Sequence, residues 1–265
     1  MRPGPRSYFL IALLALAMVL LPFLFWYSTW FGRTLSGAQF DEYLADSARP
    51  RHMQHALVQL GERLAHGQPA ARWYPQVAAL AANPNLEVRQ TAAWVMGQDK
   101  AYAPFHAVLS RLLADPEPMV RRNAALSLAG LGDATARPEL LAMLRPFTLR
   151  SPATGTVHWR LQPGDTVNPG TLVAYVAARE VRVPVPGEVQ ALELAEGASV
   201  GQGSALAELA PDPNHAWEAL RALYLVGRRE DLDDVRRFMR PMAAMPERVS
   251  RQAALTAKAI EARAE

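Results

Sequence analysis

The sequence predicts a multidomain chain of α and β structure, with an N-terminal transmembrane helix, an α-helical solenoid and a β-barrel inserted into it. Three observations predict this class. Residues 8–31 carry no charge, a helical pattern at Asn83 recurs 32 residues later at Asp115, and a strand-rich phrase occurs twice within residues 151–209. The expected parts are a cytoplasmic stub with the membrane anchor, helical repeats, a β domain and further helices, at residues 1–33, 34–147, 148–210 and 211–265.

The apolar segment from Tyr8 to Phe31 has 24 residues, and a helix needs roughly 20 to span a bilayer. Arg2 and Arg6 precede it and aromatic side chains crowd its far end, so the positive-inside rule predicts a cytoplasmic N-terminus. Pro22 would kink the helix or be absorbed by a neighbouring helix. The bulk of the chain would then be periplasmic, on a single-pass inner-membrane anchor. A cleaved signal peptide is the alternative, but its apolar run is typically only about 7–15 residues long.

Helical spacing fills the chain between this segment and the β region. The recurring units are Asn83-Pro84, Val88-Arg89 and Ala92-Ala93, which return as Asp115-Pro116, Val120-Arg121 and Ala124-Ala125. We expect the Asn or Asp to cap a helix, the proline to occupy its first turn, and the alanine pair to let helices approach closely. The pattern resembles the short HEAT-like repeat family, in which helical pairs stack into a solenoid.

The helical pattern resumes after the β region. Val249 and Ala253 repeat the spacing found after Val120, and further helices are predicted at 217–226 and 231–239. The simplest architecture is a solenoid with the barrel inserted between two of its repeats, because domain insertions succeed at exposed loops whose ends lie close together. Two independent domains followed by a helical tail are the alternative.

The doubled phrase of the β region reads Ser151–Val157 with Gly164–Leu172, and then Val183–Val189 with Gly197–Gly203. It resembles the biotinyl/lipoyl carrier domain, a barrel-sandwich hybrid in which two similar four-strand halves close into a flattened barrel. In that family a lysine on the hairpin between the halves carries the cofactor. The resemblance therefore implies a hairpin between Leu172 and Pro184.

That hairpin contains no lysine, and the chain has only Lys100 and Lys258. Amide attachment of biotin or lipoate needs a primary amine, which a guanidinium does not supply, so we predict no covalent biotin or lipoate and no other cofactor. The resemblance then implies the non-carrier branch, which serves as assembly modules in bacterial envelope adaptors. The apolar hairpin would make a protein-docking surface, or its residues would face the barrel core instead. The candidate docking residues are Tyr175, Val176, Arg179 and Arg182.

Composition and motifs exclude several function classes. The 28 basic and 25 acidic residues give a formal net charge of +3, without blocks of like charge, so nucleic-acid binding gains no support. The absence of cysteine excludes thiol catalysis and thiolate metal sites. No nucleophile elbow, phosphate-binding glycine loop or zinc-peptidase signature occurs, so we predict no enzyme activity.

We interpret most histidines and arginines as structural residues and not as parts of a catalytic or metal site. His52 and His55 lie one helix turn apart and could share a metal with a third ligand, but a solvent-facing pair is favoured. The remaining histidines are interpreted as surface or packing residues: His66, His106, His158 and His215. Arg89 and Arg121 recur in the repeat and are predicted to form ion pairs between neighbouring repeats. Adjacent arginine pairs, as at Arg121-Arg122, could meet acidic partners or be explained by nearby acids and helix ends.

Together these features favour a membrane-anchored periplasmic scaffold, or an accessory or assembly subunit, that binds a membrane protein complex such as a respiratory one. One alternative is a periplasmic adaptor of an export system, resembling the haemolysin-secretion family. That family separates its barrel halves by a long coiled-coil hairpin, whereas only about a dozen residues separate them here. A second alternative is a relative of the HEAT-like lyases that attach phycobilins.

Overall fold

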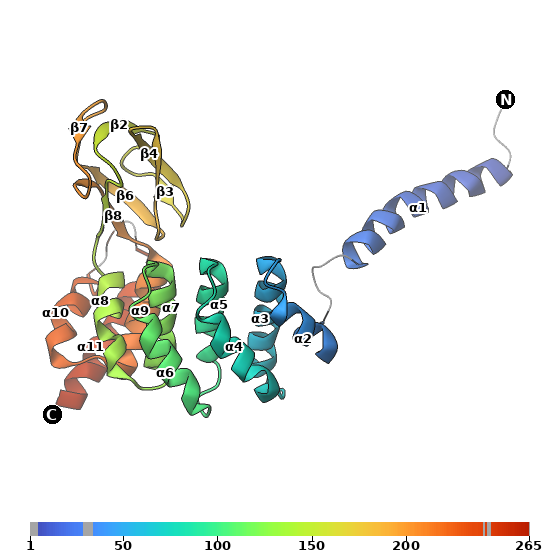
Figure 1. The fold of residues 1–265 in the computed structure, drawn as a ribbon, viewed down its shortest axis with the longest axis horizontal. Helices are drawn as coiled ribbons and strands as arrows, with labels where there is room; N and C mark the ends of the chain where they lie inside the picture. The colour runs from blue at the N-terminus through green and yellow to red at the C-terminus, as the bar shows by residue number, and fades with distance from the viewer. Residues whose placement is uncertain (1–4, 29–33, 241, 243–244, 265) are drawn as a thin grey trace.

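The computed structural model describes residues 5–28, 34–240, 242 and 245–264, and within the first helix it describes side chains for residues 13–24 (Figure 1). The helices are α1 Pro5–Ser28, α2 Gly37–Ala45, α3 Pro50–Ala65, α4 Tyr74–Leu80, α5 Leu86–Met96, α6 Ala103–Leu112, α7 Pro118–Gly130, α8 Arg137–Met143, α9 Pro213–Val226, α10 Leu232–Arg237 and α11 Glu247–Ala264. The strands are β1 Phe147–Arg150, β2 Gly155–Trp159, β3 Thr166–Val167, β4 Leu172–Val176, β5 Arg179–Arg182, β6 Gly187–Leu192, β7 Ser199–Val200 and β8 Ala205–Pro211. The chain is thus a mixed α and β protein with a helical repeat region and a curled β-sheet region.

The helices after α1 form two layers. Helices α3, α5, α7, α9 and α11 pack side by side, and each is preceded by a partner from the second layer, α2, α4, α6, α8 or α10. One apolar core, which we call the helical core, contains buried residues from both before and after the β region, from Leu35 to Leu144 and from Ala216 to Ile260. Helices α9, α10 and α11 therefore share this core with the helices that precede the β region.

The β strands interrupt a helical pair, not the boundary between two repeats. The turn between α4 and α5 and the turn between α6 and α7 each take only a few residues, and the whole of residues 144–212 replaces the corresponding turn between α8 and α9. Helices α8 and α9 still pack against each other. The strands leave and re-enter at the two ends of one turn, so the β region lies within a helical pair and not between two repeats, where it was expected (Figure 1).

The repeated Asn/Asp-Pro units shape the turns before the helices instead of capping them. The side chain of Asn83 accepts a hydrogen bond from the backbone N–H of Asn85 at 2.9 Å, and Asp115 accepts one from Glu117 at 2.9 Å. Asn85 is the residue that caps α5, by accepting from Val88 at 3.0 Å. The expected role of Asn83 and Asp115 as helix caps is therefore corrected to that of turn residues two positions earlier, a geometry that short polar side chains favour.

The recurring arginines join neighbouring repeats, as the sequence predicts. Arg89 on α5 binds both carboxylate oxygens of Asp115, at 2.8 and 3.0 Å, and Arg121 on α7 donates to Glu139 on α8 at 3.0 Å. Each arginine also donates to carbonyl groups of the turn before its own helix, including that of Pro84 for Arg89. The same side chain therefore fixes its own turn and the next helical pair, and charge-assisted bonds of this kind are stronger than neutral ones.

Each β sheet contains strands from both halves of the doubled phrase. The strand orders are β1-β8-β6-β3 and β5-β4-β2-β7, and exchanging the first four strands for the last four converts one order into the other. The sheets enclose a second apolar core of their own, which we call the β core; with the surrounding strands it forms the β unit. The internal sequence repeat is thus expressed as an internal two-fold arrangement.

Two glycines at equivalent places of the phrase allow the strands of the β unit to close together. A Cβ atom at Gly155 would lie 2.6 Å from the Cβ of Ala177, and one at Gly187 would collide with the carbonyl oxygen of Ala210. Gly155 begins β2 and Gly187 begins β6. Both positions need glycine because another backbone or side chain occupies the space of a Cβ.

The expected hairpin is formed by β4 and β5, joined by Ala177 and Ala178. Both alanines have positive φ angles, 48° and 63°. Two-residue hairpin turns with positive φ at both positions normally carry Asn-Gly or similar pairs, because a Cβ makes this conformation unfavourable.

Replacing Ala178 by Gly should therefore stabilise the β unit. The left-handed conformation costs a non-glycine residue about 1–2 kcal/mol. Glycine removes this cost, but its greater freedom in the unfolded chain cancels part of the gain in stability. We expect Ala178→Gly to raise the free energy of unfolding by roughly 0.5–1 kcal/mol, measured by urea denaturation. Ala195→Gly, at an exposed residue whose φ is not positive, is the control and should lower stability. Equal effects of the two substitutions would contradict the assignment of strain to this turn.

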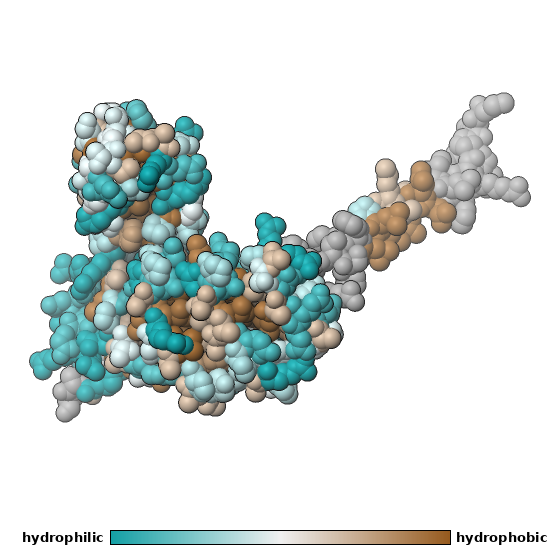
Figure 2. All heavy atoms as spheres, in the orientation of Figure 1, coloured by the Kyte–Doolittle hydropathy of each residue, from teal (hydrophilic) through white to brown (hydrophobic). Residues whose placement is uncertain are grey.

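Helix α1 extends away from the helical layers, and its described part is covered with apolar side chains (Figures 1 and 2). Leu14, Met18 and Val19 are 71, 77 and 69% exposed. Within the described part of the chain, no helix combines the length and apolar character that crossing a membrane requires. The transmembrane helix predicted over residues 8–31 is thus without support from the structure, and residues 29–31 lie outside the described part.

Candidate functional site

The predicted docking hairpin presents only part of its residues to a partner. Tyr175 lies on the outer face of β4, between His158 of β2 and Glu180 of β5, and it is half-buried. Arg179 is exposed at the hairpin end. Arg182 is held by Glu180 at 2.9 Å and by the carbonyl of Gly170 at 2.6 Å.

Val176 does not belong to this surface. Its side chain is fully buried in the β core, beside Val157 and Val181. Including Val176 among the docking residues was wrong, because alternation along β4 directs it inward while Tyr175 points outward. The interpretation that hairpin residues face the barrel core holds for Val176 but not for Tyr175.

A second polar cluster lies where the chain returns from the β unit to the helices. Strand β8 ends at Pro211, and Asp212 caps α9 by accepting hydrogen bonds from the N–H groups of Asn214 and His215, both at 2.9 Å. Arg122 of α7 donates to Nδ1 of His215 at 3.0 Å. This contact joins residues 93 positions apart and fixes the first turn of α9 against α7.

Burial governs the protonation of this pair. Arg122 is only 6% exposed, and its Nε is a buried donor without a hydrogen-bond partner among the described residues. Burial lowers the pKa of the Arg122 guanidinium to about 10, although the charge of Glu139 opposes the shift. Burial, reinforced by the charge of Arg122, also lowers the pKa of His215 below its ordinary value. His215 is therefore neutral near pH 7 and accepts the Arg122 bond.

Acid should weaken the fold through His215. Its pKa is lower in the folded than in the unfolded chain, so the unfolded chain binds the additional proton as pH falls. The stabilisation is complete above the ordinary histidine pKa of about 6.5 and is lost as pH falls below it toward the folded-state pKa.

The variant His215→Gln tests this, because an amide oxygen can still accept from Arg122 but does not titrate. We expect the loss of urea stability between pH 7 and pH 5 to be smaller than in the unchanged protein. His158→Gln in the β unit, where the histidine is exposed and pairs with Glu196, is the control. An unchanged pH dependence in His215→Gln would contradict the role of His215.

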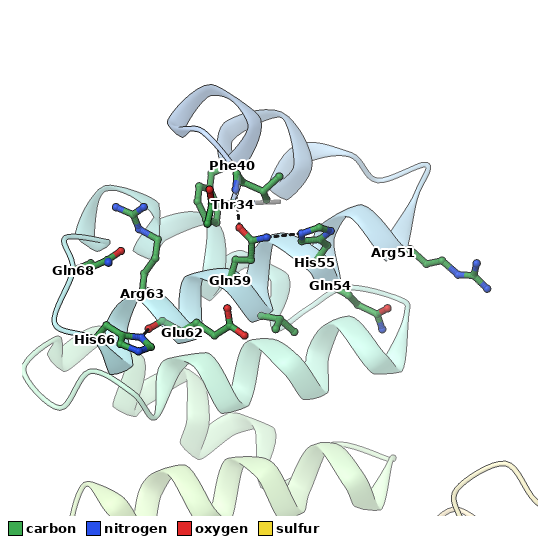
Figure 3. A pocket seen from close by; sticks show the side chains of 12 residues that line it. Thr34, Phe40, Arg51, Gln54, His55, Gln59, Glu62, Arg63, His66 and Gln68 are labelled. Carbon is green, nitrogen blue, oxygen red and sulfur yellow. Dashed lines mark hydrogen bonds between the residues drawn. The ribbon is translucent and has the colours of Figure 1, made fainter. Parts of the chain in front are cut away.

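A cavity of about 890 Å³ is bordered by α2, α3 and the segment before α2 (Figure 3). Several of its polar side chains form hydrogen bonds within the chain. Gln59 accepts from the backbone N–H of Leu35 at 2.7 Å and bonds to Nε2 of His55 at 2.7 Å, and Arg63 donates to the carbonyl of Pro69 at 3.3 Å. These contacts give the cavity a wall of fixed shape.

The histidines are paired structural residues. His52 lies 2.8 Å from Asp46 and stacks on Tyr43 with ring centroids 4.3 Å apart, so His52 and His55 are not the solvent-facing pair that was expected. His106 binds Asp133 at 2.7 Å. Among the described residues, no group of three or more His, Asp or Glu side chains could hold a metal ion.

The geometry of the helical pairs agrees with a sequence comparison. Residues 74–153 match the family described as HEAT repeats. This part of the chain contains HEAT-like repeats. The matched stretch covers α4 to α8 and strand β1. No curated protein is similar enough to the chain to count as a relative.

Sequence reasoning missed the contact of Arg122 with His215. The Arg121-Arg122 pair drew attention as a candidate acidic-partner site, and the structure separates its members: Arg121 binds Glu139, while Arg122 turns toward α9. The only local signal was the position of Arg122 on α7, between the buried residues Val120 and Ala124. Nothing in the sequence links it to a histidine beyond the β region.

Proposed function

We propose that this protein is a scaffold, or an accessory or assembly subunit, that binds a membrane protein complex through its helical layers and its β unit. The observation that carries the proposal is that helices of the layer formed by α3, α5, α7, α9 and α11 expose large apolar side chains. Those at least one third exposed include Val58 on α3, Trp94 on α5, Leu225 on α9 and Leu255 on α11. Solenoids use extended faces of this kind to bind other proteins.

The β unit supports the same proposal. We propose that it is a lipoyl-like barrel without carrier function. The internal two-fold converts the strand order of one sheet into that of the other. Ala177 and Ala178 form the end of the hairpin, where a carrier would place its lysine. The exposed end of the hairpin, with Tyr175 and Arg179 nearby, would then contact protein instead of carrying a cofactor. The export-adaptor alternative fits less well, because a two-residue turn joins the halves instead of a long coiled coil. The lyase alternative has only the helical repeats in its favour.

Membrane attachment through residues 8–31, with the bulk of the chain periplasmic, is a separate part of the proposal. It rests on the exposed apolar side chains of α1, such as Leu14 and Met18. Carbonate washing of native membranes tests it: the full chain should stay in the pellet, and a chain lacking residues 1–33 should be released. Release of the full chain would overturn attachment. An alkaline phosphatase fusion after residue 34, active only outside the cytoplasm, tests the orientation.

The binding function is tested by purifying the tagged full-length protein from its native membrane in mild detergent and measuring the stoichiometry of co-eluting proteins by mass spectrometry. We expect a membrane complex in fixed ratio to the chain. The variant Trp94→Ala removes one of these exposed side chains and should lower the recovered ratio, whereas Met239→Ala, at an exposed residue after α10, should leave it unchanged. Recovery of the protein alone, in crosslinked as well as untreated membranes, would overturn the proposal.

A further inference from the structure

Most arginines that are held in place within the helical layers bind a carboxylate. Ion pairs of this kind include Arg89 with Asp115, Arg121 with Glu139, Arg137 with Asp231, Arg145 with Asp234, Arg236 with Glu261 and Arg251 with Glu247. Arg221 on α9 and Arg248 on α11 are also held, but no described carboxylate forms an ion pair with either. Their charges therefore remain available to another molecule.

An aromatic ring holds these two arginines. The Cζ atom of Arg221 lies 4.7 Å from the ring centroid of Trp217, and that of Arg248 lies 5.4 Å from it. Arg248 also donates a hydrogen bond to the side-chain oxygen of Asn214. Guanidinium groups over an aromatic ring keep most of their N–H donors free for bidentate bonds to carboxylates. Because the side chains are already ordered, less entropy is lost when an anion binds.

A third arginine, Arg122, lies beside the first turn of α9. Arg122 reaches His215, the neighbour of Asn214, and its hydrogen-bonded partner there is neutral. Glu218 makes no ion pair within the described part of the chain, although its carboxyl is near enough for the charge of Arg221 to favour the ionised form. Around the N-terminal half of α9, three arginines, Arg122, Arg221 and Arg248, therefore meet only two acids of this helix and its N-cap, Glu218 and Asp212.

Apolar side chains continue this surface along the two helices. Leu225 on α9 and Leu255 on α11 are 52 and 57% exposed. Helices α9 and α11 pack directly against each other, and Thr256 donates to the carbonyl of Leu220 at 2.8 Å. A ligand on these helices would therefore meet fixed guanidinium groups and apolar side chains together.

We propose that this surface, the α9–α11 surface formed by Trp217, Arg221, Leu225, Arg248 and Leu255, binds an acidic, leucine-containing segment of a partner protein. The inference rests on the proposed function and specifies the binding face and the partner's chemistry. Carboxylates of the segment bind the two guanidinium groups, and its apolar side chains cover the exposed leucines. A protein is favoured over an anionic membrane because the guanidinium groups cover the ring of Trp217, which leaves the ring unsuited to insertion among lipids.

The test uses the full chain and a fluorescein-labelled amphipathic peptide rich in glutamate and leucine, with a second peptide in which every glutamate is glutamine. Fluorescence anisotropy gives the dissociation constants at low and at physiological salt. We expect the acidic peptide to bind more tightly than its glutamine counterpart, with an affinity that falls as salt screens the charges. The double variant Arg221→Gln/Arg248→Gln should weaken binding on the order of tenfold or more.

The matched control is Arg145→Gln/Arg236→Gln, which removes two charges from arginines already paired with Asp234 and Glu261. Its affinity should stay within about twofold of the unchanged protein. Equal losses in both double variants, equal binding of the two peptides, or binding to anionic vesicles without binding to the acidic peptide would each overturn the proposal. If a partner co-purifies with the unchanged protein and equally with Arg221→Gln/Arg248→Gln, the scaffold function stands and only this surface is wrong.

Discussion

The variant Gly187→Ala should unfold the β unit while leaving the helical layers folded. A Cβ at this position would collide with the carbonyl oxygen of Ala210 on β8, and a backbone atom in a paired strand cannot move aside as a flexible side chain can. Forcing extra atoms into a packed core costs typically 1–3 kcal/mol, and we expect about 3 kcal/mol here. The helical core shares no buried residue with the β core, so the damage should stay local.

Hydrogen exchange measured by mass spectrometry checks this result. Peptides within residues 147–211 should lose protection, and peptides of α5 and α7 should keep theirs. Gly201→Ala in the same unit is the control, because its Cβ would lie 3.5 Å from the Ser204 hydroxyl, an ordinary contact. Loss of protection throughout the chain in Gly187→Ala would show that the two cores unfold together.

The variant Asp231→Asn should destabilise the helical layers by about 3 kcal/mol, because it leaves a largely buried arginine with only the exposed Glu230 as its counter-charge. Asp231 is 1% exposed and accepts two hydrogen bonds from Arg137, both at 2.7 Å, and one from the backbone N–H of Arg228 at 2.8 Å. These bonds join α8, before the β unit, to the segment that begins α10, after it. The pair thus closes the helical layers across the insertion.

Urea unfolding followed by circular dichroism measures the effect. Glu230→Gln is a close control, since Glu230 binds the same Arg137 at 3.2 Å but its side chain is 75% exposed. Exposed ion pairs contribute roughly 0–1 kcal/mol, so Glu230→Gln should change the midpoint little. Similar losses in the two variants would mean that burial does not decide the strength of this pair.

Sequence patterns predicted much of the helical part because its signals are local. The recurrence from Val88-Arg89 to Val120-Arg121 gave the spacing of the repeats and the ion pairs of Arg89 and Arg121, which reach only the next helical pair. Helix caps were predicted less well: the proline units indicated the turns, but which side chain caps α5 depended on where its first hydrogen bond forms, at Asn85.

The candidate binding residues were predicted only in part. The hairpin followed from the doubled phrase, and its exposed Tyr175 and Arg179 were identified, whereas Val176 required the strand register. Trp217, Arg221 and Arg248 were not recognised, because a ring on α9 that holds an arginine from α11 is not visible in any local spacing.

The sequence by itself determined the local units of this protein: the helical period, the turn units and the doubled β phrase. These depend on residues a few positions apart or on a repeated phrase, so they can be recognised without knowing the fold. The tertiary structure alone decided which turn the β unit replaces, and which partners meet across it. Arg137 and Asp231 are 94 positions apart, and Arg122 and His215 are 93 apart. Such pairs form because α8 and α9 pack together over one apolar core, and the contact is set by that packing rather than by any pattern within either helix.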